Sequence, residues 1–348
     1  MKKLNYLLLG LAGLTMASCS NDDLSAPVSE REGNYHVTVK LPADMATRAV
    51  GDHQFGAGYE ATVLHYALYD IDGGGQLYVY DKTTSFPTDA LETTVDFNLV
   101  SGKSYAIVFF AQSEMSENNG AYKFNGREKM FTVDYDAMAT TYNQDYYDCF
   151  YQVYETGVIG NQGQNETITL YRPVAQVNWG TNDLGDPVVT NDGAYGSQAN
   201  LLVSKVQTTA YEMFNFFGLN EAEEIVGNVE GTPSNVTFAP LYRPQNEVFP
   251  VEGYEYISMQ YILVPRDQEL INLTMTVSNA GWGGNLNPNE NAITSETIEV
   301  VNAPVQANFR TNIFGTLLTD KYQYTVVKDP NWFTPDYDID LDFGMEQP

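Results

Sequence analysis

The chain has 348 residues, with 17 Lys and Arg against 45 Asp and Glu, and its formal net charge is −28 at pH 7. A surface this acidic argues against nucleic acid and anionic lipid as partners, because like charges repel. The length is sufficient for a sizeable hydrophobic core and predicts two domains.

Residues 1–18 have the pattern of an export signal. Lys2 and Lys3 form a positive n-region, "LLLGLAGL" forms an apolar h-region, and small residues lead to Cys19. The apolar run is shorter than the roughly 20 residues that a membrane-spanning helix needs. Because the segment ends on Cys rather than on A-x-A, it resembles the lipobox of a bacterial lipoprotein. That resemblance implies that Cys19 becomes the acylated N-terminus; an ordinary secretory peptide is the alternative.

Residues 19–33 are polar and contain Pro, which predicts a flexible tether. The "SNDD" after Cys19 also resembles the acidic signal that sends lipoproteins of Bacteroidota to the outer face of the outer membrane. Loss of Lys2 and Lys3 with the signal leaves 15 basic and 45 acidic residues, a net charge of −30. Once Cys19 is acylated, only Cys149 remains, so no intramolecular disulfide is expected.

From Asn34 onward the hydrophobic period is two, which is typical of half-buried strands. "YHVTVKL" (35–41) places Tyr35, Val37, Val39 and Leu41 on one face, and "TTVDFNLV" (93–100) has the same alternation. "YAIVFFAQ" (105–112) is continuously apolar, as in a strand buried on both faces. The Gly-rich "YDIDGGGQ" predicts a tight hairpin turn rather than a calcium loop, because the third acid and the distal Glu are absent.

Further strands are predicted by "ETITLYR", "VAQVNW", "YISMQYILV", "INLTMTVS", "TIEVV" and "YQYTVV". The expected fold is all-β, with two tandem antiparallel Greek-key sandwiches of transthyretin- or Ig-like type and little helix. The predicted domains are residues 34–171 and 172–328. One short helix is expected in "FGLNEAEEIVG" (217–227), with Asn220 as its cap.

The C-terminal residues 329–348 are predicted to hold an acidic strand. In "DYDIDLDF" the apolar residues Tyr337, Ile339, Leu341 and Phe343 alternate with aspartates. Such a strand suits addition to a neighbour's open groove. Completion of the chain's own sandwich is favoured over this, because a free apolar strand is an aggregation hazard. Both alternatives stay open on the sequence.

Catalytic signatures are lacking in the sequence. It contains no H-E-x-x-H, C-x-x-C or G-x-S-x-G motif. His65 is interpreted as a hydrogen-bonded sheet residue, and Cys149 as a buried residue of an aromatic sheet. No enzyme, metal site or cofactor is predicted, although a carboxylate pair of a glycosidase shows itself only in the geometry.

Three stretches together resemble the fimbrillin-type (Mfa-like) surface lipoproteins of Bacteroidales. They are the lipobox, "DMATRAV" (44–50), and the pair "LYRPVAQVNWGT" and "PVQANFRTNIFGTLLT". The pair is similar to an uncharacterised subgroup. The resemblance implies a two-domain β-sandwich pilus subunit that is exported as a lipoprotein and polymerises by strand exchange.

In that family a protease cuts after an Arg in a "TRA"-like context, which removes the first strand. The matching residues here are Arg48 and Ala49, in a Gly-containing segment of the kind that proteases reach. The predicted function is therefore a fimbrial subunit or pilus-associated adhesin at the outer membrane, with other fimbrial subunits as partners and a homopolymer as one option. The alternative is a monomeric surface lipoprotein that binds a glycan or a host protein.

Overall fold

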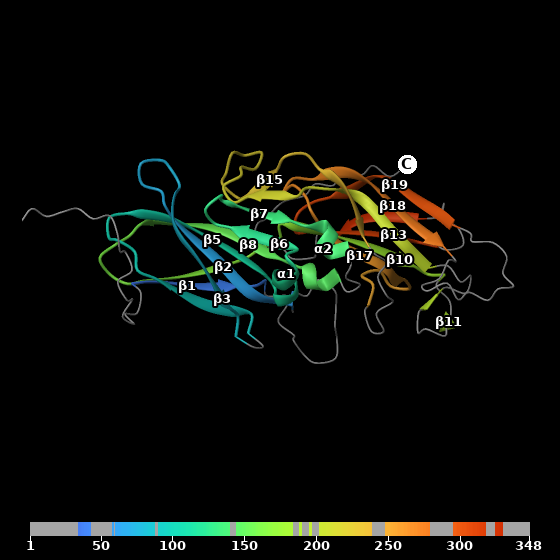
Figure 1. Ribbon diagram of the computed structural model, residues 1–348, viewed down its shortest axis with the longest axis horizontal. Coiled ribbons are helices and arrows are strands. Elements are labelled where there is room, and N and C mark those ends of the chain that lie inside the picture. The colour runs from blue at the N-terminus through green and yellow to red at the C-terminus, as the bar shows by residue number, and fades with distance from the viewer. Residues whose placement is uncertain are drawn as a thin grey trace, which may run out of the picture. The chain divides into compact units, whose positions relative to one another are not determined.

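The structure is a computed structural model that describes residues 34–42, 58, 60–87, 90–139, 144–183, 188–189, 195–196, 202–238, 248–278, 295–317 and 324–329. These residues belong to one compact unit, Gly33–Pro348. Most of the regular structure is β-strand, arranged as Figure 1 shows, so the predicted all-β class is confirmed. Within the described ranges the helices are short: α1 (Glu114–Asn119), α2 (Tyr135–Ala139) and a 3-10 helix (Gln144–Tyr147).

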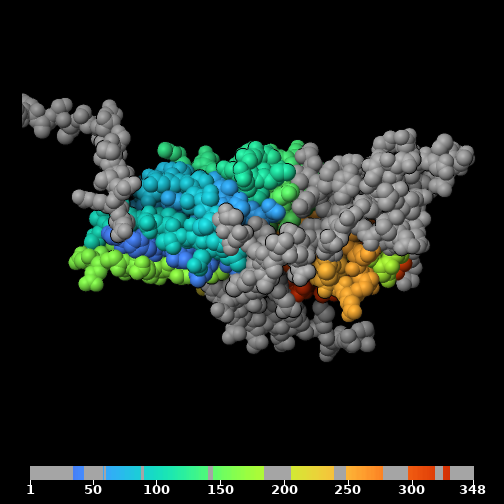
Figure 2. Space-filling view, turned by 90° about the horizontal axis from the view of Figure 1, so that it is seen from below, coloured from blue at the N-terminus to red at the C-terminus, as the bar shows by residue number. Residues whose placement is uncertain are grey.

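The first of the larger sheets, here called the β1 sheet, has three strands. Its order is β4 (Glu92–Phe97), β1 (Tyr35–Lys40) and β9 (Gln164–Thr169). β1 is antiparallel to β4 and parallel to β9. In Figure 2 the blue atoms of β1 lie beside the light-green atoms of β9 at the surface.

A four-stranded sheet, the β5 sheet, packs against the inner face of the β1 sheet. Its order is β3 (Leu77–Ser85), β2 (Ala61–Asp70), β5 (Ser104–Ser113) and β8 (Phe150–Val158). The ring of Phe97 on β4 contacts Tyr66 at 5.6 Å and Phe109 at 6.3 Å between centroids. β5 is buried along almost its whole length, as its continuous apolar sequence predicts.

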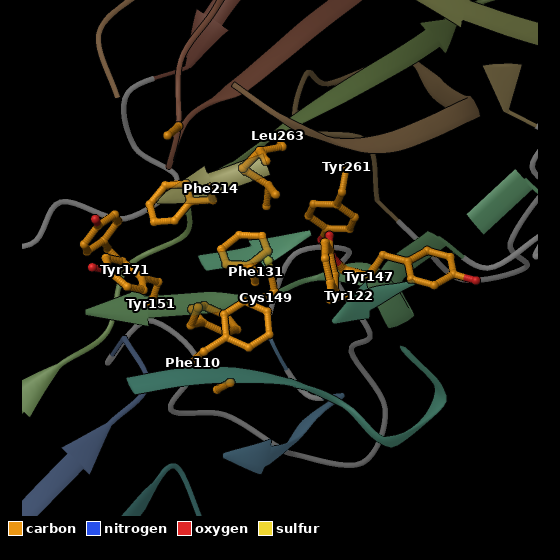
Figure 3. Packing of buried hydrophobic residues seen from close by; sticks show 14 of the residues in the cluster. Phe110, Tyr122, Phe131, Tyr147, Cys149, Tyr151, Tyr171, Phe214, Tyr261 and Leu263 are labelled. Atoms are coloured by element: carbon orange, nitrogen blue, oxygen red, sulfur yellow. The ribbon is translucent and has the colours of Figure 1, made fainter. Parts of the chain in front are cut away.

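The other face of the β5 sheet is covered by a third sheet, the β7 sheet. It contains β15 (Asn228–Glu230), β14 (Met213–Asn215), β7 (Met130–Val133) and β6 (Tyr122–Asn125). Phe110 of β5 lies 4.6 Å from Phe131 of β7, and Phe131 stacks on Phe214 of β14. Figure 3 shows this aromatic layer, in which large flat side chains fill the space between two sheets.

Strands from both sides of the predicted boundary at residue 172 therefore share the β7 sheet, since β14 hydrogen-bonds to β7. The division into domains 34–171 and 172–328 stays a prediction. The remaining strands of the second half form two four-stranded sheets and a small pair, β11 (Val188–Val189) with β12 (Tyr195–Gly196).

One of those sheets, the β10 sheet, has the order β17 (Glu255–Leu263), β10 (Val174–Thr181), β20 (Arg310–Gly315) and β21 (Tyr324–Asp329). β10 and β20 are parallel. Among the named strands there are two parallel pairs, β1–β9 and β10–β20. All other pairs in the described ranges are antiparallel, which agrees with the expected sandwich class.

The second of those sheets, the β18 sheet, has the order β16 (Ser234–Phe238), β13 (Leu202–Ala210), β18 (Glu269–Ser278) and β19 (Ser295–Val305). Its buried side chains include Val206, Met275 and Ile298, and they belong to the same hydrophobic core as Trp179 and Ile313 of the β10 sheet. Thr311 of β20 donates to the carbonyl of Pro304 on β19 at 2.6 Å, which ties the two sheets together.

The predicted helix at 217–227 is wrong. That segment contains turns and an isolated bridge between Leu219 and Ile225, and it joins β14 to β15. Asn220 Oδ1 accepts from the backbone N–H groups of Ala222 and Glu224 at 3.0 and 2.9 Å. An Asn side chain that takes backbone donors in this way stabilises a turn in place of a helix. The Gly-rich turn between β2 and β3 is where the sequence places it.

Candidate functional site

β1 is the first described strand of the chain, yet it lies in the middle of its sheet. Its register pairs Tyr35 with Phe97 of β4 and with Gln164 of β9. An N-terminal strand at this place completes the hydrogen bonding of two neighbours at once. Its loss would leave both neighbours as sheet edges with unpaired backbone groups.

The inner face of β1 is apolar and buried. Tyr35, Val37, Val39 and Leu41 are exposed by 1%, 0%, 0% and 2%. The Tyr35 hydroxyl lies 2.9 Å from that of Tyr154 on β8, which links β1 to the opposite sheet. Burial is the largest cause that raises the pKa of Tyr35, and the hydrogen bond with Tyr154 is the second. The hydroxyl of Tyr35 therefore stays neutral.

The outer face of β1 is polar, and its residues pair with those of β4. His36 Nδ1 lies 2.7 Å from Asp96 Oδ1, and Lys40 Nζ lies 2.9 Å from Glu92 Oε2. Between these pairs, the hydroxyls of Thr38 and Thr94 are 3.2 Å apart. The two faces therefore have different roles: the inner one holds the strand in the core, and the outer one matches it to the charges of β4.

Both ends of β1 are fixed by hydrogen bonds. The Asn34 side-chain amide donates to the carbonyl of Leu99 at 2.7 Å, and its oxygen accepts from the N–H of Leu99 at 2.8 Å. At the other end, Leu41 donates to the carbonyl of Leu91, and Leu170 donates to that of Lys40. The described segment stops at Pro42.

The other predicted site residues lie outside the described residues. This holds for Cys19, for Arg48 and Ala49, and for the candidate donor residues. Arg48 follows Leu41 by seven positions in the sequence. These sites therefore stay predictions. The structure does describe the whole of the first predicted strand, residues 35–41.

His65 is buried and hydrogen-bonded, as predicted. Its Nε2 lies 3.0 Å from Glu117 Oε2, and its Nδ1 lies 3.0 Å from the Thr83 hydroxyl. The ring stacks on Phe124 at 5.2 Å. A histidine with both nitrogens engaged and one face covered is a structural member of the sheet.

Cys149 lies in the aromatic layer with none of its surface exposed, as Figure 3 shows. Burial raises the pKa of its thiol well above the ordinary value, which opposes thiolate chemistry. Asp70 accepts from Lys103 and from the N–H of Asp72, and Asp72 accepts from Ser104, so both acids serve the turn. Within the described ranges no cluster of His, Cys, Asp and Glu could hold a metal ion. No helix of those ranges is long and apolar enough to cross a membrane.

The sequence reasoning missed a buried ion pair at the junction between β9 and β10. Arg172 and Asp148 are both fully buried, with Nε and Nη2 each 2.7 Å from a carboxylate oxygen. The guanidinium also lies over the ring of Phe150 at 4.4 Å. Burial raises the pKa of Asp148, and the charge of Arg172 opposes that rise. A lone Arg between apolar residues in "LYRPVA" was the available signal, but its partner is 24 residues earlier.

These observations define an all-β protein built of packed sheets, whose first described strand is the central member of a three-stranded sheet. Part of the chain is 24% identical, over 259 residues, to the major fimbrium subunit FimA type-2 of Porphyromonas gingivalis. The match covers 71% of this chain and 61% of that relative, so the chain spans less than two thirds of its length. The resemblance to fimbrillin-type proteins is thereby confirmed.

Two solved structures are similar over most of their length. A fimbrial assembly protein from Parabacteroides distasonis is 14% identical with a TM-score of 0.41, and the match covers 85% of this chain and 98% of that one. The tip fimbrial protein Mfa3 from Porphyromonas gingivalis is 10% identical with a TM-score of 0.39, over 85% and 98% of the two chains. The model of the family of unknown function DUF6562 matches residues 27–343. The chain belongs to that family.

Proposed function

We propose that this protein is a surface lipoprotein of the outer membrane that acts as a fimbrial subunit or pilus-associated adhesin and assembles by β-strand exchange. The observation that carries the proposal is the place of β1, the first described strand, in the middle of a sheet. Arg48, the candidate cleavage site, follows this strand by a short segment. A cut there separates β1 from the rest of the protein without breaking any other described strand.

Release of β1 would open a groove between β4 and β9, here called the β1 groove. Its floor is the core that Tyr35, Val37, Val39 and Leu41 now fill. Its sides are two strands with unpaired N–H and C=O groups, which is the template for adding a strand from another chain. Alternate positions of such a strand are about 6.6–6.8 Å apart, so an incoming strand needs apolar residues at every second position.

A segment with that pattern of residues is found in the same sequence. Tyr337, Ile339, Leu341 and Phe343 repeat the spacing and the aromatic-first order of the four inner residues of β1. In this proposal the tail is a donor strand. In the alternative the tail completes its own C-terminal sandwich.

The FimA match supports a location at the cell surface and an association with other fimbrial subunits. Before the cut, acylated Cys19 would supply the membrane anchor, since stable anchoring takes more than one acyl chain and bacterial lipoproteins carry several. The cut after Arg48 would release this anchor together with β1. The burial of Cys149 and the hydrogen bonds of His65 are consistent with structural roles for these two residues.

Limited digestion with trypsin tests the proposal. The first cut on the C-terminal side of β1 is expected after Arg48, giving Ala49 as the new N-terminus, because most Lys and Arg residues of the described ranges lie in or beside hydrogen-bonded strands. A cut after Arg31, in the predicted tether, leaves β1 attached and does not bear on the proposal. The cut protein should then form SDS-resistant ladders when a donor strand is supplied, whereas an Arg48→Gln protein should not. A first cut elsewhere on the C-terminal side of β1, or a cut protein that stays monomeric with every donor, would favour the monomeric lipoprotein that binds a glycan or host protein.

A further inference from the structure

We infer that the β1 groove selects a donor strand whose outward-facing residues are cationic, and therefore takes a strand from a different chain rather than from a second copy of this one. The inference rests on the proposed strand exchange and names the partner of that same groove. It follows from the charges of the strands that would flank the donor.

Of the two flanking strands, β4 carries acids on its outer face, whereas the outer positions of β9 are uncharged. The sequences of β4 (ETTVDF) and β9 (QNETIT), both among the described residues, contain the carboxylates Glu92, Asp96 and Glu166 and no Lys or Arg. Glu92 and Asp96 stand on the outer face, where their side chains are 57% and 53% exposed. β9 offers Asn165, Thr167 and Thr169 at the matching outer positions.

β1 meets these acids with one lysine and one histidine. Lys40 lies opposite Glu92, and His36 lies opposite Asp96, each within 3 Å of its partner carboxylate. Departure of β1 would remove both basic residues and leave the two carboxylates facing the incoming strand. Opposite charges directly across a pair of strands are stabilising, and like charges are destabilising.

The chain's own C-terminal segment, residues 335–348, has the wrong charge for this position. With its apolar residues turned into the groove, its outward residues are Asp338, Asp340 and Asp342. This holds for either direction of insertion, since the aspartates alternate with the apolar residues throughout. A second copy would therefore bring aspartates beside Glu92 and Asp96, and no basic residue.

The partner that fits is a strand with aromatic or aliphatic residues at alternate positions and Lys or Arg between them, spaced to face Glu92 and Asp96. By the same reasoning, the tail of this chain fits a groove whose rim is basic. The protein would then occupy a particular position in a mixed fibre, joined to unlike neighbours at both ends.

Peptide binding to the protein cut after Arg48 tests the inference. Three peptides are compared: residues 34–42 of β1, residues 335–348 of the tail, and the tail peptide with Asp338→Lys and Asp342→Lys. Binding is followed by the retention of a fluorescent label on the protein in size-exclusion chromatography. The lysine variant is expected to bind about tenfold more tightly than the native tail, and the difference should shrink at about 1 M salt, where charges are screened beyond ~3 Å.

A variant of the acceptor protein tests whether the charges of β4 cause the difference in binding. In the Glu92→Gln, Asp96→Asn protein, whose changes are at exposed positions, the native tail and the lysine variant should bind almost equally. Equal binding of both tails to the unmodified cut protein, with the β1 peptide also bound, would overturn the selection by charge and leave strand exchange intact. Failure of all three peptides, β1 included, would remove the groove itself and with it both proposals.

Discussion

Truncation of the Val37 side chain should lower the stability of the uncut protein and leave that of the assembled protein unchanged. The side chain is fully buried on the inner face of β1. Val37→Ala removes two carbon groups worth about 0.8 kcal/mol each, and the cavity that remains adds about 1 kcal/mol. The free energy of unfolding of the uncut protein should therefore fall by about 2–3 kcal/mol, and its Tm by about 5–10 °C.

The assembled protein should respond differently, because β1 has left it. Its dissociation in heated SDS, measured as the temperature at which the ladder collapses, should be the same for Val37→Ala and for the unmodified chain. Phe97→Leu on β4 is the matched control: that residue is fully buried in the uncut protein. It stays in the chain after the cut and should remain buried under a donor strand, so the change should weaken both forms. Thr38→Val, on the outer face, should alter the stability of the uncut protein by less than about 1 kcal/mol. An assembled form that loses as much stability as the uncut form on Val37→Ala would refute strand replacement.

Three further predictions concern other parts of the chain. Cys19→Ala should move the protein from the membrane fraction to the soluble fraction, and sedimentation with membranes in spite of the change would contradict the lipid anchor. Asp148→Asn should destabilise the protein by about 3–5 kcal/mol in chemical denaturation, because it leaves the buried charge of Arg172 without its counter-ion; a loss below about 1 kcal/mol would mean that the pair contributes little. Lys103 holds the pKa of Asp70 below its usual value, chiefly through their hydrogen bond. The stabilisation that this interaction gives the folded protein is complete above the pKa that Asp70 has in the unfolded chain. It is lost as the pH falls through the pKa of Asp70 in the folded protein. Lys103→Met should therefore make the loss of stability smaller as the pH falls below about 5, and an unchanged pH profile would rule that cause out.

Most strands could be predicted from the sequence because each carries its own pattern. β1 alternates buried and half-buried residues without exception, and the continuously apolar β5 is buried on both faces. The turn between β2 and β3 could also be predicted, because Gly73 and Gly74 adopt the positive φ that glycine allows.

The rest depended on pairing between distant segments. Nothing local in "YHVTVKL" shows that its neighbours are β4 and the parallel β9, more than 100 residues later. The partnership of Arg172 with Asp148 and the pairing of β14 with β7 are likewise products of the tertiary fold. At 217–227 the acidic residues favoured a helix, but the hydrogen bonds of Asn220 hold the segment in a turn between two strands.

A photo-reactive side chain at Thr94 tests the central claim most directly, since this exposed residue of β4 lies opposite Thr38 of β1. In the uncut protein, mass spectrometry should find the cross-link on residues 35–40 of the same chain. In the ladder formed after the cut at Arg48, the cross-link should instead join β4 to a strand of another chain. A cross-link that stays on the protein's own β1 in the assembled material would contradict strand exchange.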